Sequence, residues 1–218
     1  MNRVESGHPS IKWAVATVRR FCVAEEIKIV WGAFDKLGYP WGPLYKMLLV
    51  TGQRRGEVAG MRWSEINGEG WKLPGERAKT GKGHLVPLSS LAREILDGVP
   101  QIGELVFRSN RDAHVQNWSK TVKQLRKLHG PMESWHIHDL RRTFATHLRS
   151  IGIDRLTVSK LLNHAEGGTT KIYDRWAADP EKWAAMERWA HRLREIISGA
   201  PAGNVVQLKK AMPGRSDQ

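Results

Sequence analysis

Five side chains in this sequence have the types and spacing needed to break and re-form a phosphodiester bond. His138 and Arg141 are three positions apart, and His164 precedes Tyr173 by nine positions. Arg54 lies far upstream, in the run Thr-Gly-Gln-Arg-Arg-Gly-Glu. Two arginines, two histidines and a tyrosine can together stabilise a five-coordinate phosphate and attack it.

The chemistry explains why these residue types are needed. Attack turns a singly charged phosphate into a doubly charged phosphorane, so fixed cationic donors must meet the extra charge. Arginine suits this task because its planar fork binds phosphate oxygens in pairs and stays protonated, which makes Arg54 and Arg141 the candidates. Tyr173 can attack in line, and a lysine or histidine can protonate the leaving 5′-oxygen. The 3′-phosphotyrosyl product keeps the energy of the broken bond, so rejoining needs no ATP.

Each piece taken alone also has an ordinary structural explanation. Arg54 and Glu57 are three positions apart, so on a helix they would form a simple surface ion pair. A single His-x-x-Arg pair is more often structural, and Tyr173 alone would be a packing residue. Zinc is disfavoured because His136 and His138 would point apart on a helix, and no cysteine pair or His-Glu-x-x-His motif is present. We expect no metal and no cofactor.

The composition is that of a basic globular protein. The chain has 218 residues, a formal net charge of +13, a pI near 10.2 and 40% hydrophobic residues. This length fits one domain with extensions, or at most two small domains. The charge favours a polyanionic partner such as nucleic acid, although a solvated basic surface is nearly as common.

Two further features bear on the cellular location. Cys22 is the single cysteine, so no internal disulfide can form and a cytoplasmic location fits. No apolar run approaches the ~20 residues that a bilayer crossing requires. We therefore expect a cytoplasmic protein with no membrane association.

Apolar residues at helical spacing cover most of the chain. A helix is expected to open at Glu25 and Glu26 and to end in the glycine- and proline-rich segment 38–43. Further helices are expected over residues 44–50, 54–61, 91–96, 118–128 and 139–151, and after the capping residues Asp154 and Asp179. The first of the two capped helices should bury Leu156, Leu161 and Leu162, and the second Trp183, Met186, Ala190, Leu193 and Ile197.

Residues 63–88 follow a different pattern. Short apolar pieces alternate there with the turn pairs Asn67-Gly68 and Pro74-Gly75, which predicts a small antiparallel sheet with tight turns. The expected fold is therefore mainly α with a small antiparallel β-sheet, in the α+β class.

The ordered set of motifs resembles the catalytic domain of the tyrosine recombinases, the phage integrase family. The first family box, TGxRxxE, is matched by Thr51, Gly52, Arg54 and Glu57. The HxxR box and the histidine nine positions before the tyrosine follow in the family order. The family's lysine-bearing hairpin is similar to residues 78–88. The resemblance covers roughly residues 25–197 and implies the tyrosine recombinase catalytic-domain fold.

The resemblance implies a role for each candidate. Arg54 and Arg141 would clamp the scissile phosphate, and Tyr173 would be the nucleophile. Glu57 would be a supporting residue that orients the site.

Proton transfer would be shared among the remaining candidates. Lys79 would protonate the leaving 5′-oxygen, with Lys82 the less favoured choice. His138 would assist proton transfer with the tyrosine, and His164 would hydrogen-bond a phosphate oxygen.

The activity implied is site-specific DNA recombination, without metal or ATP, by an integrase of a phage or mobile element. Its partners would be double-stranded DNA and three further copies in a tetramer on DNA, with no small-molecule substrate. A type IB topoisomerase shares this chemistry, and a catalytically silent DNA-binding remnant is the alternative from another class.

Residues 1–24 are expected to be a leader or linker remnant, residues 25–197 the catalytic domain and residues 198–218 a flexible tail.

The chain departs from the family pattern at three places. A family member usually carries an N-terminal domain that clamps DNA, so we expect weak DNA binding by this chain alone. Asn163 stands where glycine often occurs, and asparagine tolerates that turn geometry. Glu166-Gly167-Gly168 should make the segment before Tyr173 mobile without DNA.

Overall fold

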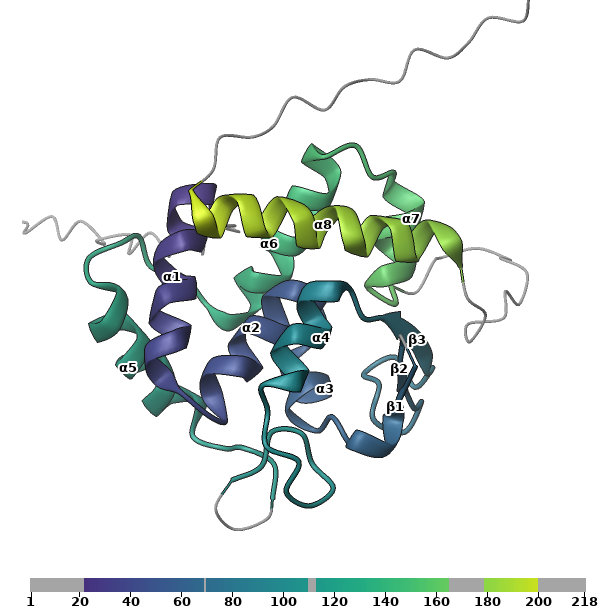
Figure 1. The fold of residues 1–218 in the computed structure, drawn as a ribbon, viewed down its shortest axis with the longest axis horizontal. Coiled ribbons are helices and arrows are strands. Elements are labelled where there is room, and N and C mark those ends of the chain that lie inside the picture. Colours follow the sequence, from purple (N-terminus) through teal and green to yellow (C-terminus); the bar gives the residue numbers. More distant parts are fainter. Residues whose placement is uncertain (1–21, 69, 110–112, 165–178, 200–218) are drawn as a thin grey trace, which may run out of the picture.

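The computed structural model describes residues 22–68, 70–109, 113–164 and 179–199. Within them the chain forms a mainly helical body with a three-stranded antiparallel sheet at one side (Figure 1). The helices are α1 (Ala24–Leu37), α2 (Trp41–Thr51), α3 (Arg55–Ala59), α4 (Ser90–Asp97), α5 (Trp118–His129), α6 (Ile137–Ser150), α7 (Arg155–Leu161) and α8 (Pro180–Ser198), with a short 3₁₀ turn at Trp63–Glu65. The expected α+β fold is confirmed.

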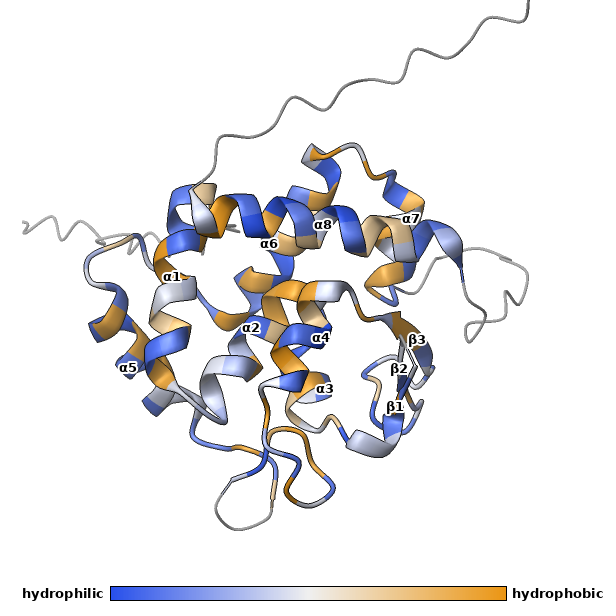
Figure 2. Ribbon diagram, in the orientation of Figure 1, coloured by the Kyte–Doolittle hydropathy of each residue, from blue (hydrophilic) through white to orange (hydrophobic). Residues whose placement is uncertain are grey.

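The helix α2 forms the centre of the core. Its buried apolar side chains are Leu44, Tyr45, Met47, Leu48, Leu49 and Val50. It packs against α1, α4, α6 and α8, and Figure 2 shows hydrophobic residues gathered on α2 and α4 in the middle of the molecule. A helix that is apolar over most of its surface has to be covered by other elements, because each exposed apolar face would lie in water. The residues that follow α2 therefore start from a rigid base.

Gly52 ends α2 and turns the chain toward the candidate site. Its φ of 66° lies in the left-handed region, and its N–H donates to the carbonyl of Leu48 at 3.0 Å. A Cβ atom at this position would lie 2.3 Å from Cδ1 of Phe144 on α6. Glycine is thus required twice, for the backbone angle and for the close approach of α6.

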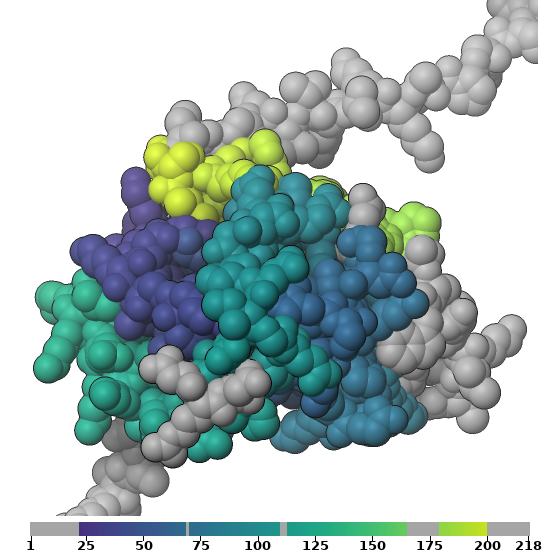
Figure 3. All heavy atoms as spheres, turned by 60° about the horizontal axis from the view of Figure 1, so that its bottom comes forward, coloured from purple at the N-terminus to yellow at the C-terminus, as the bar shows by residue number. Residues whose placement is uncertain are grey.

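The sheet consists of β1 (Ile66–Asn67), β2 (Gly70–Leu73) and β3 (His84–Pro87). β2 pairs with both neighbours, and Trp71 lies opposite Val86 in the antiparallel register with β3. The predicted sheet is confirmed, and residues 74–83 form the connection that carries Lys79. Figure 3 shows α4 and the residues after it, in teal, filling the space between α1 and the sheet.

The long helix α8 covers the top of the body in the view of Figure 1 and packs on α1, α4, α7 and β3. Asp179 caps it and Pro180 occupies its first turn, as predicted. Its buried stripe differs from the prediction, because Trp189 and Ile196 are buried whereas Trp183 and Ile197 are only half-buried.

The predicted inward face of α7 was wrong at one position. Leu156 is 51% exposed, whereas Val158, Leu161 and Leu162 are buried. Leu156 and Val158 are two positions apart, which is about 200° around a helix, so they point to opposite sides. No helix in the described segments is long and apolar enough to cross a membrane.

Candidate active site

Glu57 organises the upstream half of the site. It is 2% exposed, and its Oε2 accepts a hydrogen bond from the backbone N–H of Arg54 at 2.9 Å. Its Oε1 accepts from Nη1 of Arg54 at 3.0 Å and from the backbone N–H of Lys79 at 3.3 Å. One buried carboxylate thus holds the first arginine and the lysine-bearing connection together. This is more than the surface ion pair that spacing alone suggests.

Arg141 is a buried arginine that joins three parts of the fold. It lies on α6 and is 6% exposed. Its Nη1 donates to the carbonyl of Gly52 at 2.7 Å, and its Nη2 donates to the carbonyl of Leu162 at 2.6 Å. Burial, and then the nearby charge of Arg54, lower the pKa of Arg141 to about 10, while Glu57 opposes the shift. Arg141 therefore remains cationic at neutral pH in a fixed orientation.

His138 and His164 lie in the field of the two arginines. Partial burial is the largest cause that lowers the pKa of His138 below its usual value, followed by the charges of Arg142 and Arg141. Partial burial also lowers the pKa of His164, followed by the charges of Arg141 and Arg54. Both imidazoles remain partly open to solvent. The lowered pKa values favour the neutral form of both imidazoles, and both side chains are accessible to an incoming anion.

The β2–β3 connection brings Lys79 to the same place. Arg77 anchors its first part, because Nε donates to Oε1 of Glu65 at 3.0 Å and Nη1 donates to the carbonyl of Glu57 at 3.3 Å. Lys79 follows with an exposed side chain. Lys82 is also exposed, but of the two lysines only Lys79 lines the cavity that contains Arg54, His138 and Arg141, which favours Lys79.

These residues line one cavity of about 740 Å³. Its wall includes Arg54, Glu57, Lys79, His138 and Arg141. α5 also lines the cavity, with Trp118, Ser119, Val122, Lys123 and Arg126. His164 lies outside this wall, although it is within electrostatic reach of the arginines.

Tyr173 lies outside the described residues, so its position relative to the arginines stays a prediction. The expected mobility of its segment lies outside them too. The residues on either side of the segment are well anchored. On the far side, Oδ2 of Asp179 accepts from Nζ of Lys160 at 3.0 Å, and Nζ of the buried Lys182 donates to the carbonyl of Leu85 at 3.0 Å.

The sequence analysis missed the supporting roles of Gln53 and Arg77 and the side-chain contacts of Asn163. Nε2 of Gln53 bridges the carbonyls of Thr51 and Leu161, both at 2.9 Å. Arg77 ties the connection to Glu65, and Asn163 ties its other end to α7. The left-handed φ of 48° at Asn163 agrees with the expectation that asparagine tolerates this turn. Its side-chain contacts could not be read from the sequence, because their partners are about 80 positions away.

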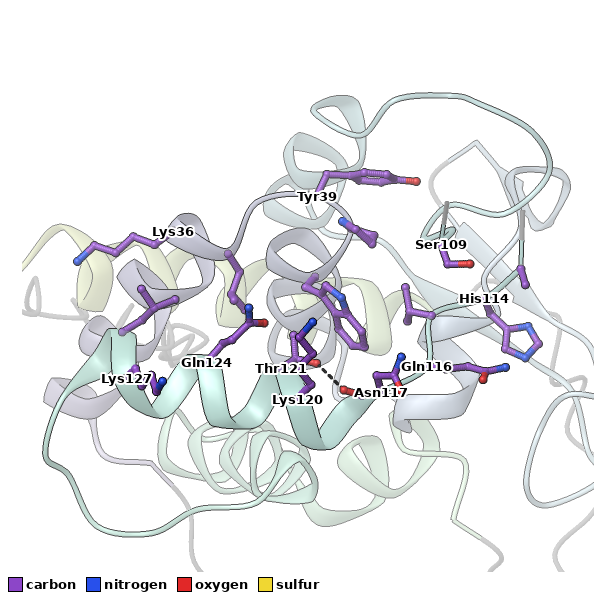
Figure 4. Close-up of a pocket in the computed structure, with 16 residues that line it drawn as sticks. Lys36, Tyr39, Ser109, His114, Gln116, Asn117, Lys120, Thr121, Gln124 and Lys127 are labelled. Atoms are coloured by element: carbon purple, nitrogen blue, oxygen red, sulfur yellow. Dashed lines mark hydrogen bonds between the residues drawn. The ribbon is translucent and has the colours of Figure 1, made fainter. Parts of the chain in front are cut away.

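A second cavity of about 970 Å³ lies on the other side of α5 (Figure 4). It is lined by the end of α1, by residues near 113–117 and by α5 itself, including Lys36, Lys120 and Lys127. Thr121 donates to the carbonyl of Asn117 at 3.2 Å within it. No residue predicted for the chemistry lines this cavity. α5 therefore presents basic side chains on two sides.

Comparison with known proteins identifies the family of the chain. The model of the Phage integrase family matches residues 27–179. The tyrosine recombinase XerA of Pyrococcus furiosus is 32% identical over 163 residues, which are 70% of this chain and 55% of that protein. The prophage integrase IntA of Escherichia coli K12 is 28% identical, over 75% of this chain and 40% of that protein. The chain belongs to the phage integrase family of tyrosine recombinases.

Solved structures share the fold. A lambda integrase tetramer bound to a Holliday junction matches with a TM-score of 0.57 and 24% identity, over 71% of this chain and 49% of that chain. The lambda integrase catalytic core matches with a TM-score of 0.54 and 26% identity, over 66% of this chain and 94% of that chain. The chain spans about half the length of the curated relatives it matches.

Proposed function

We propose that this chain contains the catalytic domain of a site-specific DNA recombinase or integrase that works through a 3′-phosphotyrosyl intermediate. The observation that carries the proposal is the cavity in which Arg54, Arg141, His138 and Lys79 come together around buried Glu57. These residues are 87 positions apart at the extremes, between Arg54 and Arg141 (141 − 54), so the fold has to assemble them. The catalytic domain is proposed to span residues 25–197.

The two arginines would clamp the scissile phosphate. Arg141 is held by two backbone carbonyls and Arg54 by a carboxylate, so neither has to reorganise when charge develops. Fixed donors in a partly dry site stabilise a phosphorane more strongly than mobile donors in water. A clamp of this kind can stabilise the phosphorane without a metal ion. We therefore predict that the reaction requires neither a metal nor a cofactor.

The remaining residues would move protons and attack. Tyr173 would form a bond to phosphorus as the bond to the 5′-oxygen breaks, and Lys79 would give a proton to that oxygen. The lowered pKa of His138 favours the neutral imidazole, which can accept the tyrosine proton, and His164 can donate a hydrogen bond to a phosphate oxygen. Reversal of these steps would rejoin the strand without ATP.

The proposed partner is double-stranded DNA, and α5 supports this proposal. Its twelve residues contain Lys120, Lys123, Arg126 and Lys127 but no acidic residue. In the described part of the chain none of these four side chains forms an ion pair, so they are available to phosphates. A lambda integrase tetramer binds a Holliday junction in its crystal structure, and we propose a tetramer on DNA for this chain as well. A cytoplasmic location is proposed, in line with the single cysteine.

Two other readings are less well supported. A type IB topoisomerase would relax DNA without exchanging partners, whereas the matched relatives are recombinases and integrases. A silent DNA-binding module would not need the buried carboxylate and the two-carbonyl anchor that hold Arg54 and Arg141 in place.

Relaxation of supercoiled plasmid tests the proposal without knowledge of the target site. The assay contains EDTA and no ATP, and SDS traps covalent intermediates. We expect relaxation and a trapped adduct with the native chain and neither with Tyr173→Phe, which should still bind DNA. Relaxation by Tyr173→Phe at the native rate would contradict the assignment of the nucleophile.

A further inference from the structure

Asn163 has a structural role that turn geometry does not explain. Asn163 is only 8% exposed. It lies just after the end of α7 and directly before His164. Its φ of 48° could be adopted equally well by glycine. An asparagine amide at this position is therefore an additional feature, and its contacts show what it does.

Both N–H groups of the Asn163 amide have acceptors in the β2–β3 connection. Nδ2 donates to the carbonyl of Lys82 at 2.7 Å and to Oγ1 of Thr80 at 3.1 Å. Thr80 and Lys82 are themselves joined, because Oγ1 of Thr80 donates to the Lys82 carbonyl at 3.3 Å and accepts from the Lys82 N–H at 3.4 Å. The amide therefore closes a small network around the tip of the connection.

Lys79 lies between this network and a second anchor. Its backbone N–H donates to Oε1 of Glu57, and Thr80 follows it directly. Glu57 fixes the connection to α3, and Asn163 fixes it to the end of α7. Without the contacts of Asn163, the connection of residues 74–83 on this short hairpin would be held only on the side of Glu57.

We propose that Asn163 is a positioning residue, which holds Thr80 and Lys82 so that Lys79 is in place to protonate the leaving 5′-oxygen. This inference rests on the proposed function. Proton donation by a placed acid is sensitive to distance, because a displacement of about 1 Å can lower a rate by up to ~100-fold. The Asn163 amide donates to the β2–β3 connection and to neither arginine, whereas the carbonyl of its neighbour Leu162 orients Arg141. The amide is therefore assigned to the proton transfer, and the arginine clamp is tested separately.

Hydrogen exchange of the free protein tests the clamp without any DNA chemistry. Asn163→Gly keeps the left-handed turn and removes only the amide. We expect faster exchange at the N–H groups of Gly81 and Lys82, with native exchange in β2. Unchanged exchange at these positions would overturn the clamp.

Cleavage of a leaving-group analogue tests the link to Lys79. Trapped plasmid adducts first map a cleavage site, and duplexes are then made with oxygen or sulfur as the 5′-bridging atom. A sulfur leaving group departs as a thiolate and needs no proton. We expect Asn163→Gly to slow oxygen-substrate cleavage ~10-fold and Lys79→Ala ~100-fold or more, with both close to native on sulfur.

Matched variants separate positioning from general damage. Thr80→Val removes one acceptor of the amide and should show a smaller defect of the same type, whereas Thr80→Ser keeps the hydroxyl and should behave as native. Arg141→Ala should be slow on both substrates. A defect of Asn163→Gly that is equal on oxygen and sulfur, or absent on both, would overturn the link to Lys79. If the native chain cleaves neither duplex, the proposed function fails and hydrogen exchange still decides the clamp.

Discussion

Replacement of Glu57 by glutamine removes one charge and changes one atom from acceptor to donor, so its effect can be worked out from the structure. The carboxylate accepts three hydrogen bonds, from the backbone N–H and Nη1 of Arg54 and from the N–H of Lys79. Whichever oxygen the amide NH₂ replaces, it faces at least one of these donors. Each charge-assisted hydrogen bond contributes about 1.5–3 kcal/mol, and loss of a partner also leaves a buried donor unsatisfied.

The expected loss of folding free energy is about 2–3 kcal/mol, since the Arg54 side chain is partly solvated and solvent screens part of its ion pair. For a chain of this length that corresponds to a Tm lowered by roughly 4–12 °C. Cleavage should also slow by ~10–100-fold, because Arg54 loses the anchor that orients it. Thermal unfolding followed by circular dichroism measures the first effect, and plasmid relaxation measures the second.

Glu94→Gln is the matched control for this prediction. Glu94 forms an ion pair with Arg194, but its side chain is 61% exposed, against 3% for Glu57. An exposed ion pair is worth about 0–1 kcal/mol, so this variant should unfold close to the native temperature and keep native activity. If Glu57→Gln destabilised the protein no more than Glu94→Gln, the organising role of Glu57 would be refuted.

Three further predictions follow from the described contacts. Gly52→Ala should lower the free energy of unfolding by about 3 kcal/mol, because of the left-handed backbone and the clash with Phe144. Gly32→Ala should raise it by about 0.5–1 kcal/mol, because the space around its Cβ is open. Urea unfolding measures both effects. Burial, and then the charges of nearby arginines, lower the pKa of His138 and His164. A bound phosphate offsets the arginine charges and raises both pKa values, so DNA affinity should rise as the pH falls below neutral. The rise should shrink in a variant with both histidines changed to glutamine, and an unaltered pH dependence would contradict this coupling. Changing Lys123 and Arg126 together to glutamine should lower the slope of log affinity against log salt by about 1.8 in fluorescence anisotropy, whereas an unchanged slope would exclude both from phosphate contact.

Local patterns in the sequence predicted the elements well, because their causes are local. Asp154 and Asp179 cap the helices that follow them, and the Gly68 turn joins two short strands. The inward face of α7 was assigned wrongly at Leu156, because a short helix has too few apolar residues to fix its orientation before its neighbours are known.

The sequence pointed to Arg54, Lys79, His138 and Arg141, which line one cavity in the structure, but it did not reveal the contacts that hold them. Motif order suggested Arg54 and Arg141, and the family resemblance suggested Glu57 as a supporting residue. The two carbonyls that orient Arg141 come from Gly52 and Leu162, which are 89 and 21 positions away from it. Such contacts depend on how helices pack, and no local pattern encodes them.

The most direct test of the account is to identify the protein–DNA bond itself. The native chain is incubated with plasmid in EDTA, the adduct is trapped with SDS, the DNA and protein are digested, and the nucleotide-bearing peptide is sequenced by mass spectrometry. We expect a nucleotide joined through its 3′-phosphate to the phenolic oxygen of Tyr173. Attachment through a 5′-phosphate, or to any other residue, would contradict it.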